Sequence, residues 1–156
     1  MQNKPLDRID RRIVQELQYN GRISNVELAR RVGLSATPCL ERVRRLEQQG
    51  VILGYQANID PTKVGSSLLV FIEVTLDRAA PDVFERFNSA VVQLEEILEC
   101  YLVSGNFDYL LKTRVADMSA YRAMLSQTLL KLPNVSDTRT YVVMEEVQAK
   151  TRLQIK

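Results

Sequence analysis

The chain has 156 residues, of which 46% are hydrophobic and 26% charged, and its formal net charge is +2. This composition is typical of a soluble globular protein with one or two small domains, and it excludes fibrous and disordered chains. No apolar stretch approaches the roughly 18 residues of a membrane span, and the N-terminus lacks a signal-peptide core, so we expect a cytoplasmic protein without a membrane partner. Histidine is absent, and Cys39 and Cys100 have no second cysteine nearby. We therefore expect no metal site, no cofactor and no enzyme.

Basic residues are concentrated in residues 1–60. Ten Lys/Arg against seven Asp/Glu give this segment a charge of +3, whereas eleven against twelve give the remainder −1. Nine of the ten cations are arginine, whose planar guanidinium suits phosphate and guanine. This pattern favours contact with nucleic acid, and a solvated surface is the alternative.

The first two helices are predicted from capping residues. The first follows Asp7 as N-cap and ends at residues 20–21, an Asn-Gly pair. The second follows Ser24, which forms a capping box with Glu27, and it ends at Gly33, which can adopt the left-handed conformation. We expect a short second helix joined by a glycine turn to a third.

The third helix is predicted to follow Ser35 and to run to residues 49–50. Its expected inward side chains are Cys39, Leu40, Val43 and Leu46. The layout is that of a helix-turn-helix, and the side chains expected to bind DNA are Ser35, Thr37, Pro38, Glu41, Arg42, Arg44 and Arg45. Glu41 either accepts from a cytosine amine or pairs with Arg45, and we favour the pair. A three-helix bundle with a charged surface is the alternative.

A strand and linker over residues 51–66 separate this domain, residues 1–50, from a second one, residues 67–156. Hydrophobic spacing in the second domain predicts six elements in the order strand, helix, strand, strand, helix, strand. Their ranges are 67–76, 81–94, 98–104, 108–115, 117–132 and 138–147, with a tight hairpin turn at Gly105-Asn106. Such a βαββαβ order is ferredoxin-like, so we expect an α+β fold.

One face of the predicted sheet has no helix to cover it. Its strands nevertheless carry apolar residues on both faces, namely Leu68/Leu69, Leu110/Leu111 and Val142/Val143. A second copy of the same sheet would bury the uncovered face, so we expect a homodimer. A monomer with a few exposed apolar residues is the alternative.

Five stretches resemble the Lrp/AsnC family of bacterial transcription regulators. They are residues 6–10 (LDRID), 21–28 (GRISNVEL), 37–46 (TPCLERVRRL), 102–114 (LVSGNFDYLLKTR) and 137–146 (DTRTYVVMEE). The resemblance implies a winged-type helix-turn-helix and a C-terminal domain that senses a small amino acid. It further implies a cytoplasmic, nucleoid-associated activator or repressor on double-stranded DNA, with dimers that assemble into octamers or larger rings.

The resemblance places the effector between dimers, near the loop of residues 105–108. Asp108 could accept from the ammonium group of an amino acid, and Gly105 leaves backbone amides open to its carboxylate. The expected walls and hydroxyls are Met118, Thr140, Tyr141, Val142 and Val143, from the same or a neighbouring subunit. An apolar wall favours leucine or methionine, and alanine stays open. Without the resemblance, the loop would be interpreted as a plain hairpin turn.

Two other functions, an enzyme and a DNA-packing protein, make different demands on the sequence. An enzyme would need a reactive pair, but Glu95-Glu96 and Glu145-Glu146 are adjacent in sequence, so on strands they would point to opposite faces. An architectural DNA-packing protein would keep the arginines and need no effector pocket. The sequence therefore favours a DNA-binding regulator of amino-acid metabolism, with DNA packing as the alternative.

Overall fold

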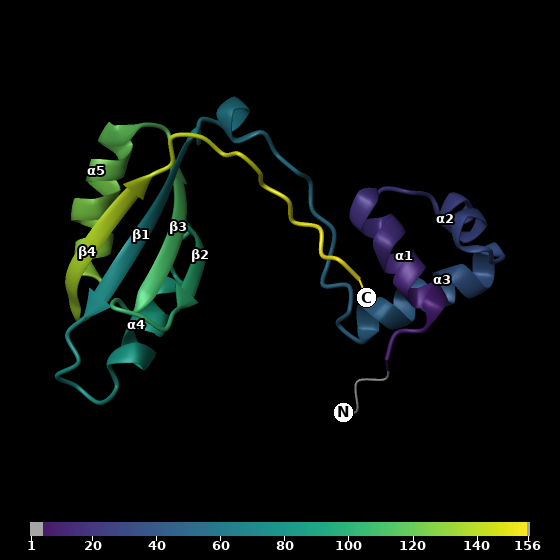
Figure 1. The fold of residues 1–156 in the computed structure, drawn as a ribbon, viewed down its shortest axis with the longest axis horizontal. Coiled ribbons are helices and arrows are strands. Elements are labelled where there is room, and N and C mark those ends of the chain that lie inside the picture. Colours follow the sequence, from purple (N-terminus) through teal and green to yellow (C-terminus); the bar gives the residue numbers. More distant parts are fainter. Residues whose placement is uncertain (1–4, 156) are drawn as a thin grey trace. The chain divides into compact units, whose positions relative to one another are not determined.

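The computed structural model describes residues 5–155, which form two compact units (Figure 1). One comprises the chain up to Asn58 together with the segment from Gln148 on, and the other is Ile59–Val147. The predicted sheet domain, residues 67–156, therefore loses its last segment to the helical unit. The physical reason is packing, because Ile155 contacts the helical core and the backbone of Leu153 is held by hydrogen bonds to that unit. No helix in the described part is long and apolar enough to cross a bilayer.

The helical unit contains α1 (Arg8–Tyr19), α2 (Asn25–Val32) and α3 (Ala36–Gln48), close to the predicted ranges. Its buried core is made by residues of all three helices, namely Ile13, Val14, Leu28, Ala29, Val32, Cys39 and Leu46. Leu40 was predicted to point inward but is 37% exposed. It lies about 100° around the helix from Cys39, beyond the arc that faces the core.

The caps of these helices agree only in part with the sequence. Asp7 accepts hydrogen bonds from two amides of the first turn of α1, and Gly33 ends α2 at a φ of 77°. Ser24 caps α2, but the carboxylate of Glu27 pairs with two arginines of α2, so the predicted capping box is only half formed. Ser35 stands at the predicted N-cap of α3 without a side-chain hydrogen bond.

The strand expected over residues 51–59 is absent, because these residues form bends and irregular backbone. A strand needs a neighbour for its amides and carbonyls, and no described residue pairs with this run. Its apolar side chains are largely exposed, with Leu53 94% and Ile59 58% accessible. A short 3-10 helix, Pro61–Val64, follows.

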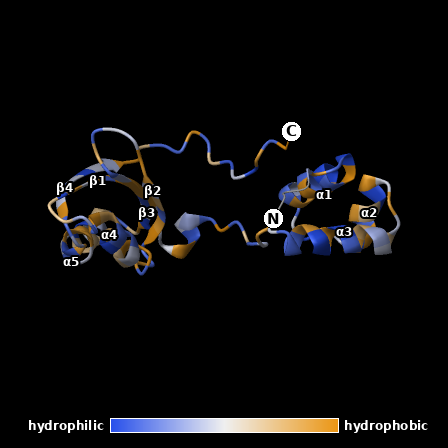
Figure 2. Ribbon diagram, turned by 90° about the horizontal axis from the view of Figure 1, so that it is seen from below, coloured by the Kyte–Doolittle hydropathy of each residue, from blue (hydrophilic) through white to orange (hydrophobic). Residues whose placement is uncertain are grey.

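The second unit is a four-stranded antiparallel sheet with two helices, which confirms the predicted α+β, βαββαβ fold. Its elements are β1 (Leu68–Leu76), α4 (Val83–Val91), β2 (Ile97–Leu102), β3 (Tyr109–Val115), α5 (Met118–Gln127) and β4 (Val135–Val142). The strand order is β2-β3-β1-β4. Both helices lie on the same side of the sheet (Figures 1 and 2), so within residues 59–147 no helix covers the other side.

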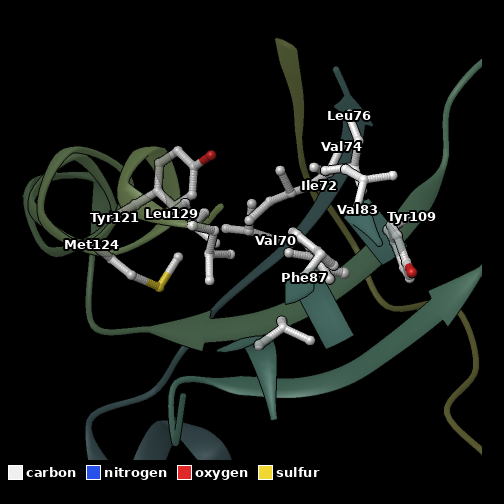
Figure 3. Close-up of a cluster of buried hydrophobic side chains, with 13 residues drawn as sticks. Val70, Ile72, Val74, Leu76, Val83, Phe87, Tyr109, Tyr121, Met124 and Leu129 are labelled. Carbon is white, nitrogen blue, oxygen red and sulfur yellow. The ribbon is translucent and has the colours of Figure 1, made fainter. Parts of the chain in front are cut away.

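The core of this unit lies between the sheet and the two helices (Figure 3). Alternate residues of β1 point into it, with Val70, Ile72, Val74 and Leu76 at most 4% exposed. From α5 the buried side chains are Tyr121 and Met124, whereas Met118, expected from the sequence in the wall of the effector site, is 46% exposed. The inward stripe of α5 thus leaves the first residue of the helix outside the core.

Two boundaries differ from the sequence prediction. The connection between β2 and β3 is the six-residue loop 103–108, closed by a 3.0 Å bond from the Val103 amide to the Asp108 carbonyl, rather than a tight turn at Gly105-Asn106. β4 begins at Val135 and ends at Val142, five residues early. Its partner β1 starts at Leu68, so the chain runs out of backbone partners there.

Candidate DNA-binding and effector sites

The outward face of α3 is solvent-exposed. Thr37, Glu41 and Arg44 are exposed and follow a spacing of four and three residues, so they share one face of the helix. Gln48 continues this spacing and is also exposed. Gln48 was not among the residues expected to bind DNA, although the same periodicity places it on this face. We call Thr37, Glu41, Arg44 and Gln48 the reading face.

Two of the predicted DNA-binding arginines lie instead on the flank of α3 next to α1. Arg42 donates from Nη1 to Asp10 Oδ1 at 2.8 Å and to Asp7 Oδ2 at 2.5 Å. Arg45 donates from Nη2 to both carboxylate oxygens of Asp10, at 2.8 and 2.7 Å. The favoured pair between Glu41 and Arg45 does not form, because Asp10 of α1 occupies that guanidinium.

These contacts shift the ionisation of the groups involved. The hydrogen bond from Arg42 lowers the pKa of Asp7 below its ordinary value of 3.8. Asp7 and Asp10 in turn raise the pKa of Arg42. Both groups are therefore charged throughout the physiological pH range. On α2, the neighbouring Arg30 and Arg31 lower the pKa of Glu27 to about 2.

The loop expected to hold the effector contains a buried carboxylate. Asp108 is 2% exposed, and its Oδ2 accepts from the Leu76 amide at 2.8 Å. Its Oδ1 pairs with Arg78, whose side chain is 68% exposed and lies 5.8 Å from the centre of the Phe84 ring. Asp108 thus fixes the end of β1 and orients a cation at the surface.

These residues line an open depression of about 410 Å³. Its lining residues are Arg78, Phe84, Leu102, Val103, Ser104 and Asp108. A cation, an anion and an apolar wall in one depression match the three parts of an apolar amino acid. Asp108 was expected from the sequence to line the effector site, whereas Arg78, which lies 30 positions earlier, was not. No local motif links these two residues.

The other predicted effector residues do not converge on this depression. β3 runs from Tyr109, beside Asp108, to Val115, a rise of about 20 Å at 3.3 Å per residue. Met118 follows the far end of β3, and Val142 pairs with Val70 near the same end of the sheet. Gly105 and Asp108 therefore form one group, and the residues at the opposite end form another.

The two middle residues of the predicted β4 wall lie on opposite faces of the sheet. The Thr140 hydroxyl contacts the Tyr121 hydroxyl of α5, on the helix-covered face. The Tyr141 hydroxyl donates to Glu73 Oε1 at 3.0 Å on the open face. Thr140 is therefore engaged within the core of its own subunit.

The open face of the sheet carries apolar and charged side chains together. The register aligns Phe71 with Tyr141 on one side and with Lys112 on the other. Lys112 pairs with Glu99 at 2.8 Å. Tyr141 is 44% exposed, and Leu69, although on this face, is 6% exposed. This face, with half-exposed aromatic residues framed by ion pairs, is suited to contact another protein surface.

Comparison with known proteins gives the family. Residues 69–153 match the family of Lrp/AsnC ligand binding domains, and residues 6–52 match winged helix-turn-helix DNA-binding domains. The chain belongs to the Lrp/AsnC family. It is a DNA-binding transcriptional regulator with a helix-turn-helix domain and an amino-acid-binding domain.

Individual Lrp/AsnC relatives are similar over nearly the whole chain. The leucine-responsive regulatory protein of Escherichia coli strain K12 is 71% identical over 153 residues, which are 98% of this chain and 93% of the relative. A transcriptional regulator of Neisseria meningitidis solved as an L-methionine complex is 39% identical, with a TM-score of 0.91 over 96% of this chain and 97% of that one. A feast or famine regulatory protein from M. tuberculosis complexed with L-methionine is 37% identical, with a TM-score of 0.87 over 96% and 99%.

Proposed function

We propose that this Lrp/AsnC regulator binds double-stranded DNA with α3 and that leucine, or methionine or alanine, controls this binding. The exposed reading face of α3 is the observation that carries the DNA part of the proposal, because a free helical face with an arginine fits the major groove. The name of the E. coli relative supports leucine, and the two methionine complexes support methionine.

The proposed DNA contacts differ in kind along α3. Arg44 has no ion pair within residues 5–155, so its guanidinium is available to a base edge or a phosphate. Ser35 keeps its hydroxyl free of a capping bond at the start of the helix, where Thr37 and Pro38 are also exposed and amides favour phosphate. Of the remaining predicted residues, Glu41 lies on the reading face, and Arg42 and Arg45 lie on the flank.

The substitution Arg44→Ala tests this assignment. If Arg44 contacts DNA as proposed, its loss is expected to cost about 1–3 kcal/mol of binding free energy, or roughly 5- to 150-fold in Kd. Gel shifts on a target duplex and on random duplexes measure this change. A base contact lowers affinity for the target alone, whereas a phosphate contact lowers both. Arg122→Ala, which removes an exposed arginine of α5 in the other unit, is the matched control, and equal affinities of Arg44→Ala and wild type would reject the assignment.

The depression beside Asp108 is the proposed effector site. The ammonium group would approach Asp108, the carboxylate would meet Arg78 or the backbone amides at Gly105, and the side chain would pack on Phe84 and Leu102. Met118, Tyr141, Val142 and Val143 would contribute from a neighbouring subunit, since they lie away from the depression in their own. Thr140, committed to Tyr121, would act by supporting β4.

Calorimetric titration with leucine, methionine and alanine separates the sensing regulator from the alternative, an architectural DNA-packing protein. The regulator is expected to bind at least one of the three at the site and to change its DNA affinity as it does so. Because the wall is apolar, leucine and methionine should bind more tightly than alanine, by about 0.8 kcal/mol for each additional buried methylene. Glutamate serves as the control ligand. Absence of heat with all three would favour the DNA-packing protein.

The proposed assembly is a homodimer formed through the open face of the sheet, with dimers joined into octamers or larger rings. Half-exposed aromatic side chains on that face support the dimer. We also propose that the protein is a cytoplasmic, nucleoid-associated activator or repressor of bacterial genes without catalytic activity, as its relatives are transcriptional regulators.

A further inference from the structure

The three arginines of α3 differ in their surroundings. Arg42 and Arg45 donate together three hydrogen bonds of 2.7–2.8 Å to Asp10, and Arg42 donates another, of 2.5 Å, to Asp7. Asp10 is 5% exposed, whereas the side chain of Asp7 is 50% exposed. Arg44, on the reading face, has no such partner among residues 5–155. Two of the three cations of the recognition helix are therefore opposed by carboxylates of α1.

A carboxylate as buried as Asp10 is stable only with charged partners and good hydrogen-bond geometry. Both of its partners lie on α3, so the contact fixes the direction in which each guanidinium points. Arg42 uses Nη1 for these bonds and Arg45 uses Nη2. Each guanidinium has other N–H groups that donate no hydrogen bond to any described residue. These groups can still donate to DNA when α3 lies in the correct position in the groove.

We propose that Asp10, assisted by Asp7, is a positioning residue that sets the selectivity of DNA binding by holding and neutralising Arg42 and Arg45. This inference rests on the proposed function, in which the reading face of α3 contacts DNA. Affinity for random DNA depends on the number of phosphates that cations neutralise, since each releases condensed counterions. Arginines held by carboxylates add little to this counterion-release contribution to affinity. They contribute to binding only when the protein is positioned on the DNA so that their remaining N–H groups meet hydrogen-bond acceptors.

The test is the salt dependence of DNA binding by the full-length Asp10→Asn variant. The DNA probes are a duplex selected by the wild-type protein from a random-sequence pool and the unselected pool itself. On the unselected pool, the slope of log K against log salt concentration should steepen by about 0.9 for each arginine that gains a phosphate. Affinity for the unselected pool at low salt should rise, and the ratio of selected to unselected affinity should fall.

Asp7→Asn is the second variant, because asparagine caps a helix about as well as aspartate and the fold is kept. It removes one of the two carboxylates that hold Arg42 and leaves both arginines paired with Asp10, so we expect a smaller change in the same direction. Glu95→Gln makes the same charge change in the other unit, where Glu95 is exposed, and should leave the slope unchanged. If Asp10→Asn does not fold, the slope of Asp7→Asn decides.

A purely structural role for Asp10 predicts a different result. Thermal stability would fall and both affinities would drop by the same factor, with unchanged slopes, and this outcome overturns the inference. The Arg44→Ala variant separates its failure from failure of the proposed function. If Arg44→Ala weakens DNA binding but neither aspartate variant changes the slope, only the positioning role is wrong. If Arg44→Ala has no effect either, α3 is not the reading element.

Discussion

Replacing Asp108 with alanine is expected to destabilise the sheet unit and to abolish the amino-acid response. The Leu76 amide at the end of β1 would lose the Asp108 carboxylate that accepts its hydrogen bond, and a buried unpaired N–H costs about 1–3 kcal/mol. The lost pair with Arg78 adds little to this, since that side chain is 68% exposed. Urea unfolding followed by circular dichroism measures the stability, and calorimetry with leucine and methionine measures the response.

Asp108→Asn separates the two roles of this carboxylate. Asparagine can still accept from the Leu76 amide but carries no charge for an ammonium group or for Arg78. We expect stability close to wild type and a loss of effector affinity of about 1.5–3 kcal/mol, roughly tenfold or more in Kd. Arg78→Ala is the companion variant for the carboxylate of the ligand. Wild-type effector affinity in Asp108→Asn would contradict the placement of the site.

Local signals predicted most of the secondary structure. The N-cap at Asp7 and the left-handed glycine at Gly33 depend on a few neighbouring residues. Both helix ends can therefore be predicted without knowledge of the tertiary structure. The alternation of buried and more exposed side chains along β1 likewise follows from the period of two residues in a strand. Where a boundary depends on a distant partner, as at the end of β4, the sequence alone extended the element too far.

The site was harder to predict, because its contacts join residues far apart in the chain. Arg45 meets Asp10 across 35 positions, and a sequence pattern offered only Glu41 as its partner, four residues away. Arg78 reaches Asp108 across 30 positions. Both pairs exist because tertiary packing buries a carboxylate next to an arginine. Helical periodicity grouped the three arginines of α3. It could not distinguish Arg44, which has no ion pair with any residue from 5 to 155, from Arg42 and Arg45, which are held by carboxylates.

The contacts of the segment from Gln148 on could not be predicted from local sequence either. Leu153 exchanges two hydrogen bonds with the side-chain amide of Gln18, at 2.6 and 3.1 Å, and Arg152 lies 4.4 Å from the centre of the Tyr19 ring. Nothing in the local sequence of this segment indicates that it belongs with the helical unit. The sheet unit is therefore an insertion between two parts of the DNA-binding unit, connected to it by the chain at both ends.

Introducing a charge at Phe71 is expected to dissociate the proposed dimer. Phe71 is half-buried at the centre of the open face, between Tyr141 and Lys112, and lies two residues from Glu73 on the same face. In a dimer through this face, Phe71→Glu would place two additional carboxylates in a desolvated interface. Loss of a central aromatic contact alone costs about 2 kcal/mol or more, so the dimer Kd should rise at least roughly thirtyfold.

Sedimentation velocity measures this change, and circular dichroism shows whether the monomer keeps its fold. The fold is expected to persist, because Phe71 is already partly exposed and the cation of its cross-strand neighbour Lys112 can pair with the new carboxylate. Val92→Glu makes the same kind of change at a side chain that is 72% exposed after α4 and should leave the dimer intact. If Phe71→Glu and wild type sediment alike as dimers, the subunits associate elsewhere. In that case the aromatic residues of the open face are exposed for another reason.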